Sequence, residues 1–522
     1  MYPREYSQNQ LTLGHTPHRP AMRKRFDLVI LGFLLLLASS LRVELLSVRS
    51  LWIDEALSLD LASQSIERIL ATSRTSEPHP PGYYVALRLW LSFLGNNFLS
   101  ARVFSVLFGS LSVLLTWSLA GMVGDRRVAL AAAAIVAIHP FQVFASAEVR
   151  MYAMLTALGL ASTLTLMLAL EQERFWAWLL YGILIASVAY ISYYGFLLAG
   201  AHFLACVTTR RHFTSRLGPL AAALVALLSY APWIPSLWGS ITSNPVPWRP
   251  KIDVWYSIGI AITQTFGGYV FQTPAYHFSP SPRISWMVLG LSAVILLGRG
   301  VRACLRESHT KSLIALSWLV PVLMVIGLSV ALNKQIAYYY HILYLQPYAA
   351  VLLLVGIRDV VKRVSWAVRP IVELACVAGI MVIMAVGTHE MQRGSGEVYR
   401  FDVVGRWLAA RYSKEDVVFY YAHVGKRVLR YYFDPDGPEI VVSLDPRSWT
   451  REDALTLLEK GVGILRKEDR RVWLVLTPPV PEGSVGDLVR LLEKKGFVPR
   501  EGLLLRGVRV LGLVREERER RR

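Results

Sequence analysis

The chain has few cysteines for its length. Its 522 residues include three of them, Cys206, Cys304 and Cys376, which lie in or beside apolar runs without CxxC spacing. This pattern argues against a structural zinc site and against a need for disulfides, and it leaves the redox compartment open. The sequence also lacks a glycine-rich phosphate loop at a strand–helix junction, so it predicts no nucleotide site.

Acidic residues are also scarce, which leaves a strongly basic chain. It has 56 Lys and Arg against 37 Asp and Glu, a formal charge of +19. In a soluble protein this charge would indicate a nucleic-acid partner. Here the basic residues form short clusters between apolar runs, as orientation signals do in membrane proteins. We therefore predict no nucleic-acid partner.

Long hydrophobic runs are abundant. Hydrophobic residues make up 54% of the chain, its mean hydropathy is +0.40, and several runs approach the ~20 residues that cross a bilayer. The predicted fold class is a polytopic α-helical protein of the cell (plasma) membrane, with a cytoplasmic tail at 1–25 and a transmembrane domain at 26–390. The alternative for the first span, a signal peptide ending near Ala38-Ser39-Ser40, is disfavoured by the long leader and the later spans. Basic residues before this span place the loop 47–100 outside.

The number of spans depends on residues 83–97. If this run crossed the membrane, Arg126, Arg127 and most later basic clusters would lie outside. If it forms a short in-plane or re-entrant helix, every basic cluster falls inside. The run is short and carries Arg88 midway, so we predict the second arrangement, with about eleven spans (range 11–13). The expected spans are 27–46, 101–122, 128–145, 151–170, 175–190, 192–207, 217–238, 284–300, 312–332, 337–357 and 369–387.

Two further regions are expected outside. The loop 239–283 is rich in glycine, proline and aromatic residues, and loops of that length are usually functional or form lids. Residues 391–522 alternate short β-rich runs with helical patterns, which predicts an α/β domain with a largely parallel sheet. The strands are expected at 417–421, 440–443, 472–477 and 508–514.

The first outward loop contains an acidic stretch between apolar segments. It opens with the adjacent carboxylates Asp54 and Glu55 and closes on His79, which precedes two prolines, Tyr83 and Tyr84. Between these ends an amphipathic pattern predicts a helix in the headgroup layer. Two carboxylates are therefore expected to be held at the membrane surface.

A second polar group follows the span 128–145. Glu148, Arg150 and Tyr152 lie there and are expected at the same outer level as Asp54 and Glu55. An ionisable residue at the end of a span is a candidate for function because it is costly unless solvated or paired. The equally weighted alternative is a structural role, either a Glu148–Arg150 ion pair or ordinary snorkelling of these side chains at the membrane interface.

Group transfer is the chemistry that suits such an outer site. Because free nucleotides are absent outside the cytoplasm, the donor is expected to be a sugar on a membrane-anchored polyprenyl phosphate. A carboxylate can act as general base toward an acceptor hydroxyl. A cation would stabilise the leaving phosphate, and Arg249, Lys251 and Lys334 are the candidates.

Four segments in order, LWIDEALSLDLA, HPPGYYVAL, ARVFSVLFGSL and EVRMY, resemble the GT-C glycosyltransferases of the protein O-mannosyltransferase and aminoarabinose transferase branch. The resemblance covers most of residues 25–390 and extends to the C-terminal domain. It implies a polyprenyl-phosphate sugar donor and inversion at the anomeric carbon. It also implies that Asp54 is the catalytic acid of the first loop, with Glu55 beside it and Glu148 in the second outward loop.

The chain departs from this branch at one motif. Where the branch often has Arg-Tyr before a late proline, Tyr340-His341 stand here, which puts the expected phosphate contact in doubt. Tyr340 and His341 are retained as substrate-binding candidates, although the Tyr338–Tyr340 run also fits an interfacial aromatic belt. His79 fits a hydrogen-bonding loop residue better than a metal ligand. The sequence does not identify a cofactor with certainty, and it leaves open whether a divalent metal is bound.

The sequence therefore predicts an inverting glycosyltransferase that moves a sugar to an acceptor hydroxyl of a protein, lipid or glycan on the outer face of the membrane. Two alternatives belong to other classes. A transporter would place its site near the bilayer midplane on repeated, broken helices, whereas the acids here gather at one surface and no clear repeat is found. A non-catalytic scaffold for envelope assembly would use the C-terminal domain for docking.

Overall fold

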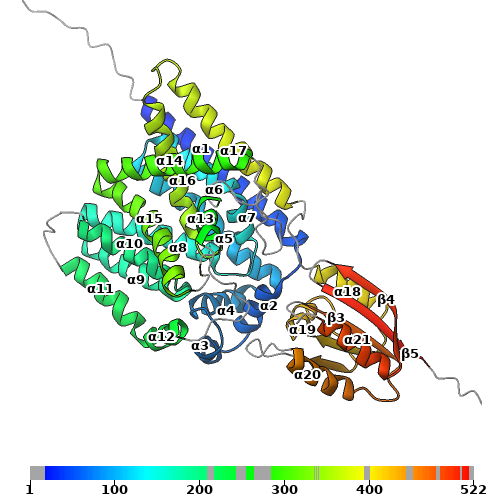
Figure 1. The fold of residues 1–522 in the computed structure, drawn as a ribbon. Coiled ribbons are helices and arrows are strands. Elements are labelled where there is room, and N and C mark those ends of the chain that lie inside the picture. The colour runs from blue at the N-terminus through cyan, green and yellow to red at the C-terminus, as the bar shows by residue number, and fades with distance from the viewer. Residues whose placement is uncertain are drawn as a thin grey trace, which may run out of the picture.

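The computed structural model describes residues 18–208, 217–242, 254–263, 284–333, 336, 338, 340–392, 400–421, 423–442, 451–477, 483–505 and 508–516. They form a helical bundle and a smaller domain of helices and strands that lies against one end of it (Figure 1). The predicted fold class, a multi-pass helical membrane protein with a C-terminal α/β domain, is confirmed.

The helices of the bundle and of its connecting segments follow one another along the chain. They are α1 (His18–Val48), α2 (Ile53–Ala62), α3 (Ile66–Thr75), α4 (Gly82–Leu94), α5 (Phe98–Val123), α6 (Arg126–Ile138), α7 (Pro140–Ser146), α8 (Tyr152–Gln172), α9 (Phe175–Ile191), α10 (Gly195–Thr208), α11 (Leu217–Tyr230), η1 (Ala231–Trp233), α12 (Ile234–Thr242), α13 (Val254–Thr263), α14 (Ile284–Glu307), α15 (His309–Ala331), η4 (Leu343–Leu345), α16 (Gln346–Val361) and α17 (Arg369–Gln392).

Seven helices among the described residues are long and apolar enough to cross a membrane, or eight if the bent pair α6 and α7 is one span. The sequence predicted about eleven. The other three expected spans are the helices α9, α10 and α14, of which α9 and α10 have 17 and 14 residues. At 1.5 Å per residue, α9 and α10 reach about 26 and 21 Å, less than the ~30 Å hydrocarbon core. Length and composition therefore support a lower count than the sequence predicted.

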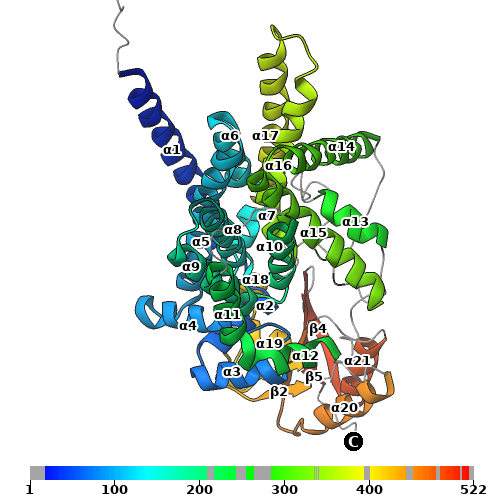
Figure 2. The same ribbon diagram turned by 90° about the vertical axis from the view of Figure 1, so that its left-hand side faces the viewer.

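The loop that the sequence predicts to be the first outward one contains three short helices, α2, α3 and α4. The amphipathic pattern after Asp54 is divided between α2 and α3, because Ser65 begins a new helix by accepting a hydrogen bond from the Arg68 amide. The helix α4 has 13 residues, about 20 Å, too few to cross. Figure 2 shows α4 lying across the end of the bundle, as expected for an in-plane helix.

The break between α6 and α7 bends the chain by 58°. It lies at Pro140, the first residue of α7, which has no amide hydrogen to continue the ladder of α6. Carbonyls freed at the end of α6 are bound by side chains of other helices. Arg42 Nη1 donates to the Ala137 carbonyl at 2.9 Å, and Thr388 Oγ1 donates to the Ile138 carbonyl at 2.6 Å. The hydrogen-bonding capacity of these carbonyls is thus satisfied inside the bundle. The short helix α7 then leads to Glu148 and Arg150, which follow its last residue.

The C-terminal domain contains a five-stranded sheet among the described residues, in the order β2-β1-β3-β5-β4. Its elements are α18 (Phe401–Ala409), β1 (Val417–Tyr421), α19 (His423–Leu429), β2 (Glu439–Val442), α20 (Arg451–Gly463), β3 (Arg471–Leu476), α21 (Ser484–Lys494), β4 (Phe497–Leu505) and β5 (Val508–Arg515).

The prediction of a largely parallel sheet needs correction. Strands β2, β1 and β3 pair in parallel, whereas β5 pairs antiparallel with both β3 and β4. Strand β4, which contains Pro499, was not among the strands expected from the sequence. Proline cannot donate to a ladder and so is confined to edge strands and bulges. Here β4 is the edge strand, with an irregularity between Pro499 and Glu501.

The two faces of the sheet belong to different cores. All five residues of β1 are buried, as expected of a central strand covered on both sides. Val418 and Tyr420 join a hydrophobic core that is continuous with the helical bundle, whereas Val417 and Phe419 join a second core on the other face of the sheet. The domain thus shares apolar packing with the membrane part. It lies at the end of the bundle where α2, α3 and α4 are found (Figures 1 and 2).

Candidate active site

The helix α2 carries the two adjacent carboxylates. Its N-cap is Trp52, in extended conformation, and Glu55 at the third helical position accepts a hydrogen bond from the Trp52 amide at 3.4 Å. Asp54 is therefore inside the first turn and is not the N-cap residue. This leaves its side chain available for another role.

The Glu55 side chain is fully buried and held by an arginine from α5. Arg102 donates from Nε to Oε1 at 2.9 Å and from Nη2 to Oε2 at 2.8 Å. The Val149 amide also donates to Oε1, at 3.0 Å. Both oxygens of this predicted catalytic residue are thus engaged inside the protein, and Glu55 joins α2 to α5 and to the loop before α8.

Glu148 pairs with Arg49 and not with Arg150. Its Oε1 lies 3.1 Å from Arg49 Nη2, and its side chain is 4% exposed. The alternative of a Glu148–Arg150 ion pair is therefore wrong. Burial raises the pKa of the Glu148 carboxyl to about 7, with Arg49 opposing part of that rise. Glu148 can consequently exchange a proton near neutral pH.

Arg150 approaches Asp54. Its Nη2 lies 3.7 Å from Asp54 Oδ2, and its Nη1 donates to Ser58 Oγ at 3.2 Å. Whereas the arginine side chain is 3% exposed, that of Asp54 is 35% exposed. Of the three predicted catalytic carboxylates, only Asp54 combines an accessible side chain with a buried cation beside it.

The segment before α4 brings a fourth carboxylate to the same place. Tyr84 donates its hydroxyl to Glu77 Oε1 at 2.8 Å, and both side chains are buried. Burial raises the pKa of Glu77, while the nearby charge of Arg150 lowers it. His79 is half-buried, in the loop before α4. Tyr83 is buried against Tyr84 and Phe104, so both of these tyrosines pack in the core.

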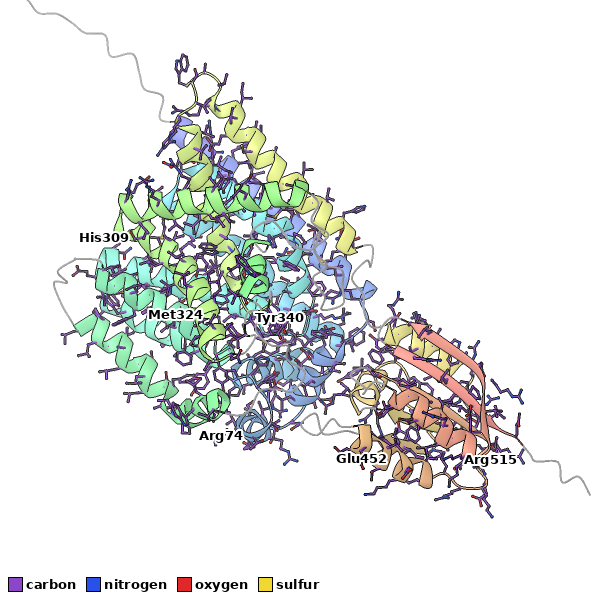
Figure 3. The ribbon with its side chains drawn as sticks, in the orientation of Figure 1. Arg74, His309, Met324, Tyr340, Glu452 and Arg515 are labelled. Atoms are coloured by element: carbon purple, nitrogen blue, oxygen red, sulfur yellow. The ribbon has the colours of Figure 1, made fainter. Side chains whose placement is uncertain are left out.

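Aromatic side chains extend the site into the bundle. Arg150 lies 6.0 Å from the centroid of the Tyr152 ring, which in turn lies 5.4 Å from that of Tyr340. The rings of Tyr340 and Tyr338 stack at 5.5 Å, and His341 lies 4.4 Å from Tyr340. In Figure 3, Tyr340 lies on the bundle side of α2 and α4. Tyr338 is only 7% exposed, which contradicts the alternative of an interfacial belt for this residue.

The structure thus brings most of the predicted residues together, from α2, the α7–α8 turn and the segment before η4. Arg249, Lys251 and Lys334 lie outside the described residues. Within the described ranges, no three His, Cys, Asp or Glu side chains are grouped as a metal site would require. His202 is buried in the core, where its ring nitrogens contact the hydroxyls of Thr163 at 3.0 Å and Tyr181 at 3.3 Å.

Sequence reasoning missed Arg49, Arg102 and Glu77. Arg102 carried a usable signal, because an arginine inside an apolar run needs a buried partner. Arg49 is set apart only by its position after the first span, and Glu77 only by its nearness to His79. The partners of Arg49 and Arg102 lie 99 and 47 positions away in the chain, so no local pattern predicted those two pairs.

The chain is similar to known proteins in part of its sequence and in its fold. Residues 78–236 match the family model of dolichyl-phosphate-mannose-protein mannosyltransferase. No curated protein sequence matches the chain. Among solved structures, ArnT from Cupriavidus metallidurans in the apo state matches with a TM-score of 0.61 at 12% identity, covering 94% of this chain and 98% of that one.

Two more solved structures are similar. The same ArnT bound to undecaprenyl phosphate matches with a TM-score of 0.62, 12% identity and the same coverage. The oligosaccharyltransferase of Archaeoglobus fulgidus, tethered to an acceptor peptide, matches with a TM-score of 0.51 at 12% identity, covering 96% of this chain and 75% of that one. The predicted resemblance to the mannosyltransferases is thus confirmed over residues 78–236, and the predicted resemblance to the aminoarabinose transferases is confirmed at the level of the fold.

Proposed function

We propose that this chain is a membrane glycosyltransferase of the mannosyltransferase and ArnT type, and that it transfers a sugar from a polyprenyl-phosphate donor to an acceptor hydroxyl on the outer face of the membrane. The accessible Asp54 carboxylate beside buried Arg150 is the observation that carries the proposal. The undecaprenyl phosphate bound to the similar ArnT supports a lipid-phosphate donor.

In the proposed step, the acceptor oxygen attacks the anomeric carbon while its proton passes to Asp54. The bond from that carbon to the phosphate oxygen breaks, and the polyprenyl phosphate leaves with the electron pair. The new bond forms on the face opposite the leaving group, so the configuration inverts. Asp54 is the general base, since its side chain is 35% exposed and can reach a bound hydroxyl.

The other acidic residues have supporting roles in this proposal. Glu55 fixes the α2 helix through Arg102, which keeps Asp54 in place for in-line attack. Glu148 holds Arg49 next to the same loop. Arg150 anchors both Asp54 and Ser58 on α2. The aromatic cluster around Tyr340 offers apolar ring faces for the donor.

A transfer assay with reconstituted protein tests the proposal. It uses a panel of radiolabelled polyprenyl-phosphate sugars and membrane extracts as acceptor source. The Asp54→Asn variant keeps the shape of the side chain and removes its basicity, so kcat should fall by ~10²–10⁴-fold with little change in donor KM. Glu67→Gln, at an exposed acid of α3, is the matched control and should keep wild-type rates. Turnover of Asp54→Asn within a few-fold of wild type would exclude Asp54 as the base.

A further inference from the structure

The helix that carries Asp54 is held from two sides. Arg102 holds it from the bundle, and α19 of the C-terminal domain packs against its other side. At its start, the Leu51 amide donates to the Tyr432 hydroxyl at 2.7 Å, three residues before Asp54. Leu51 is fully buried, so its amide has this hydroxyl in place of water.

A second contact lies near the other end of α2. Asp60 Oδ2 is 3.0 Å from Arg427 Nε, and Asp60 Oδ1 accepts a hydrogen bond from the Tyr431 hydroxyl at 3.2 Å. Arg427 belongs to α19, and Tyr431 is the second residue after that helix. The two contacts are nine positions apart in α2 and its approach, and Asp54 lies between them.

Helix α18 packs closely against the residue that makes the first of these contacts, Tyr432. A Cβ atom on Gly405 of α18 would lie 2.6 Å from the Cβ atom of Tyr432, closer than real Cβ atoms approach one another. Glycine at this position therefore allows α18 to lie directly on the turn that carries Tyr432. From the same helix, the Asp402 amide donates to Ser50 Oγ at 3.3 Å.

The ion pair between Arg427 and Asp60 is expected to add little to the stability of the fold. The side chains of Arg427 and Asp60 are 32% and 40% exposed, and exposed ion pairs typically contribute only ~0–1 kcal/mol. Their position at the end of the catalytic helix gives a better reason, since a displacement of ~1 Å can cost ~10²-fold in rate.

We propose that the C-terminal domain positions the catalytic base: Tyr432, Tyr431 and Arg427 hold α2 at both ends and set the place of Asp54. This inference rests on the proposed function for its catalytic part. None of these three side chains contacts the reacting atoms in this scheme, and they act through α2. The domain is thus part of the transfer machinery although it lies outside the bundle.

The test uses the full chain, reconstituted in lipid, with two matched pairs of variants. Tyr432→Phe removes the acceptor of the Leu51 amide, and Tyr421→Phe makes the same change at a buried tyrosine of β1 that packs in the second core. Arg427→Met removes the ion pair with Asp60, and Arg490→Met removes an ion pair on α21. Arg427→Lys keeps the positive charge, so it should retain most of the activity that Arg427→Met loses.

Two readouts are measured for each variant: hydrogen exchange of the amides from Leu51 to Glu55, and kcat and donor KM. In Tyr432→Phe, exchange at Leu51 should rise, and kcat should fall by about tenfold, a loss within the range for small displacements, with donor KM unchanged. Arg427→Met should also lower kcat without changing donor KM. The two control variants should match wild type in both readouts.

Exchange at Leu51 that stays at the wild-type rate in Tyr432→Phe overturns the proposal, as does faster exchange with an unchanged kcat. If the wild-type protein transfers no sugar from any donor of the panel, the proposed function fails. In that case the exchange rates alone decide whether the C-terminal domain holds α2.

Discussion

Arg102 of α5 and Glu55 of α2 form a two-point ion pair whose side chains are both 0% exposed. The pair also determines the roles of two neighbours in the sequence. Because Glu55 is turned inward to Arg102, Asp54 at the preceding position faces the accessible site. A helix places adjacent residues about 100° apart, so both cannot point the same way.

This buried pair should contribute strongly to stability. Removing one partner leaves the other charge buried without compensation, which typically costs ~3–5 kcal/mol. We therefore expect Arg102→Met to lower the Tm of the detergent-solubilised protein clearly. Arg88→Met, at a surface arginine of α4, is the control and should change it little. A wild-type Tm for Arg102→Met would contradict this account.

Glu148 should make stability depend on pH. Its pKa is raised by burial from 4.5 to about 7, so the folded state binds the proton more tightly than the unfolded state. The contribution of Glu148 to stability is therefore fully present below pH ~4.5 and is lost as pH rises through about 7.

Thermal unfolding from pH 4.5 to 8 measures this effect. Glu148→Gln cannot ionise, so its Tm relative to wild type should increase across this interval and level off above it. A difference in Tm that is constant with pH would show that Glu148 does not titrate there.

The donor phosphate should be bound by basic residues of the long outward loop or the late spans. An unpaired phosphate near hydrocarbon is costly, and charge-assisted hydrogen bonds offset that cost. Replacing Arg249, Lys251 or Lys334 singly with Met should raise the apparent donor KM more than it lowers kcat. Wild-type donor kinetics in all three variants would mean that the phosphate is bound elsewhere.

The orientation of the chain in the membrane can be tested by labelling. The pattern of basic clusters predicts that the loop between α5 and α6 is cytoplasmic and that the C-terminal domain is outside. Arg127, in the first turn of α6 next to this loop, and Lys495 of the C-terminal domain are both exposed. An impermeant thiol reagent on intact cells should label Lys495→Cys and leave Arg127→Cys unlabelled, in a background with Cys376→Ser. The reverse pattern would invert the topology.

The sequence by itself determined the class of protein and the region of the site. Apolar runs of about twenty residues indicate membrane helices, since a bilayer core sets their length. An acidic stretch between such runs indicates function, because a charge near hydrocarbon is costly. The same signals placed Asp54, Glu148, Arg150 and Tyr152 in one region, and the structure shows Asp54 3.7 Å from Arg150.

Short helices and an edge strand were harder to predict. Whether α9 and α10 cross depends on a few residues of length, which hydropathy alone does not resolve. The strand β4 contains Pro499, which lowers the local preference for a strand, and it forms because β5 offers a partner. In both cases neighbouring elements decide the outcome.

Only the tertiary structure decided which carboxylate remains accessible. Asp54 and Glu55 are adjacent and chemically alike, and Glu148 lies in the second loop that the sequence predicts to face outward. Arg102 lies 47 positions from Glu55, and Arg49 lies 99 positions from Glu148. Ion pairs of this separation form when folded helices bring their side chains together, so local sequence carries no record of them. The same holds for Tyr432, which reaches Leu51 across 381 positions of the chain.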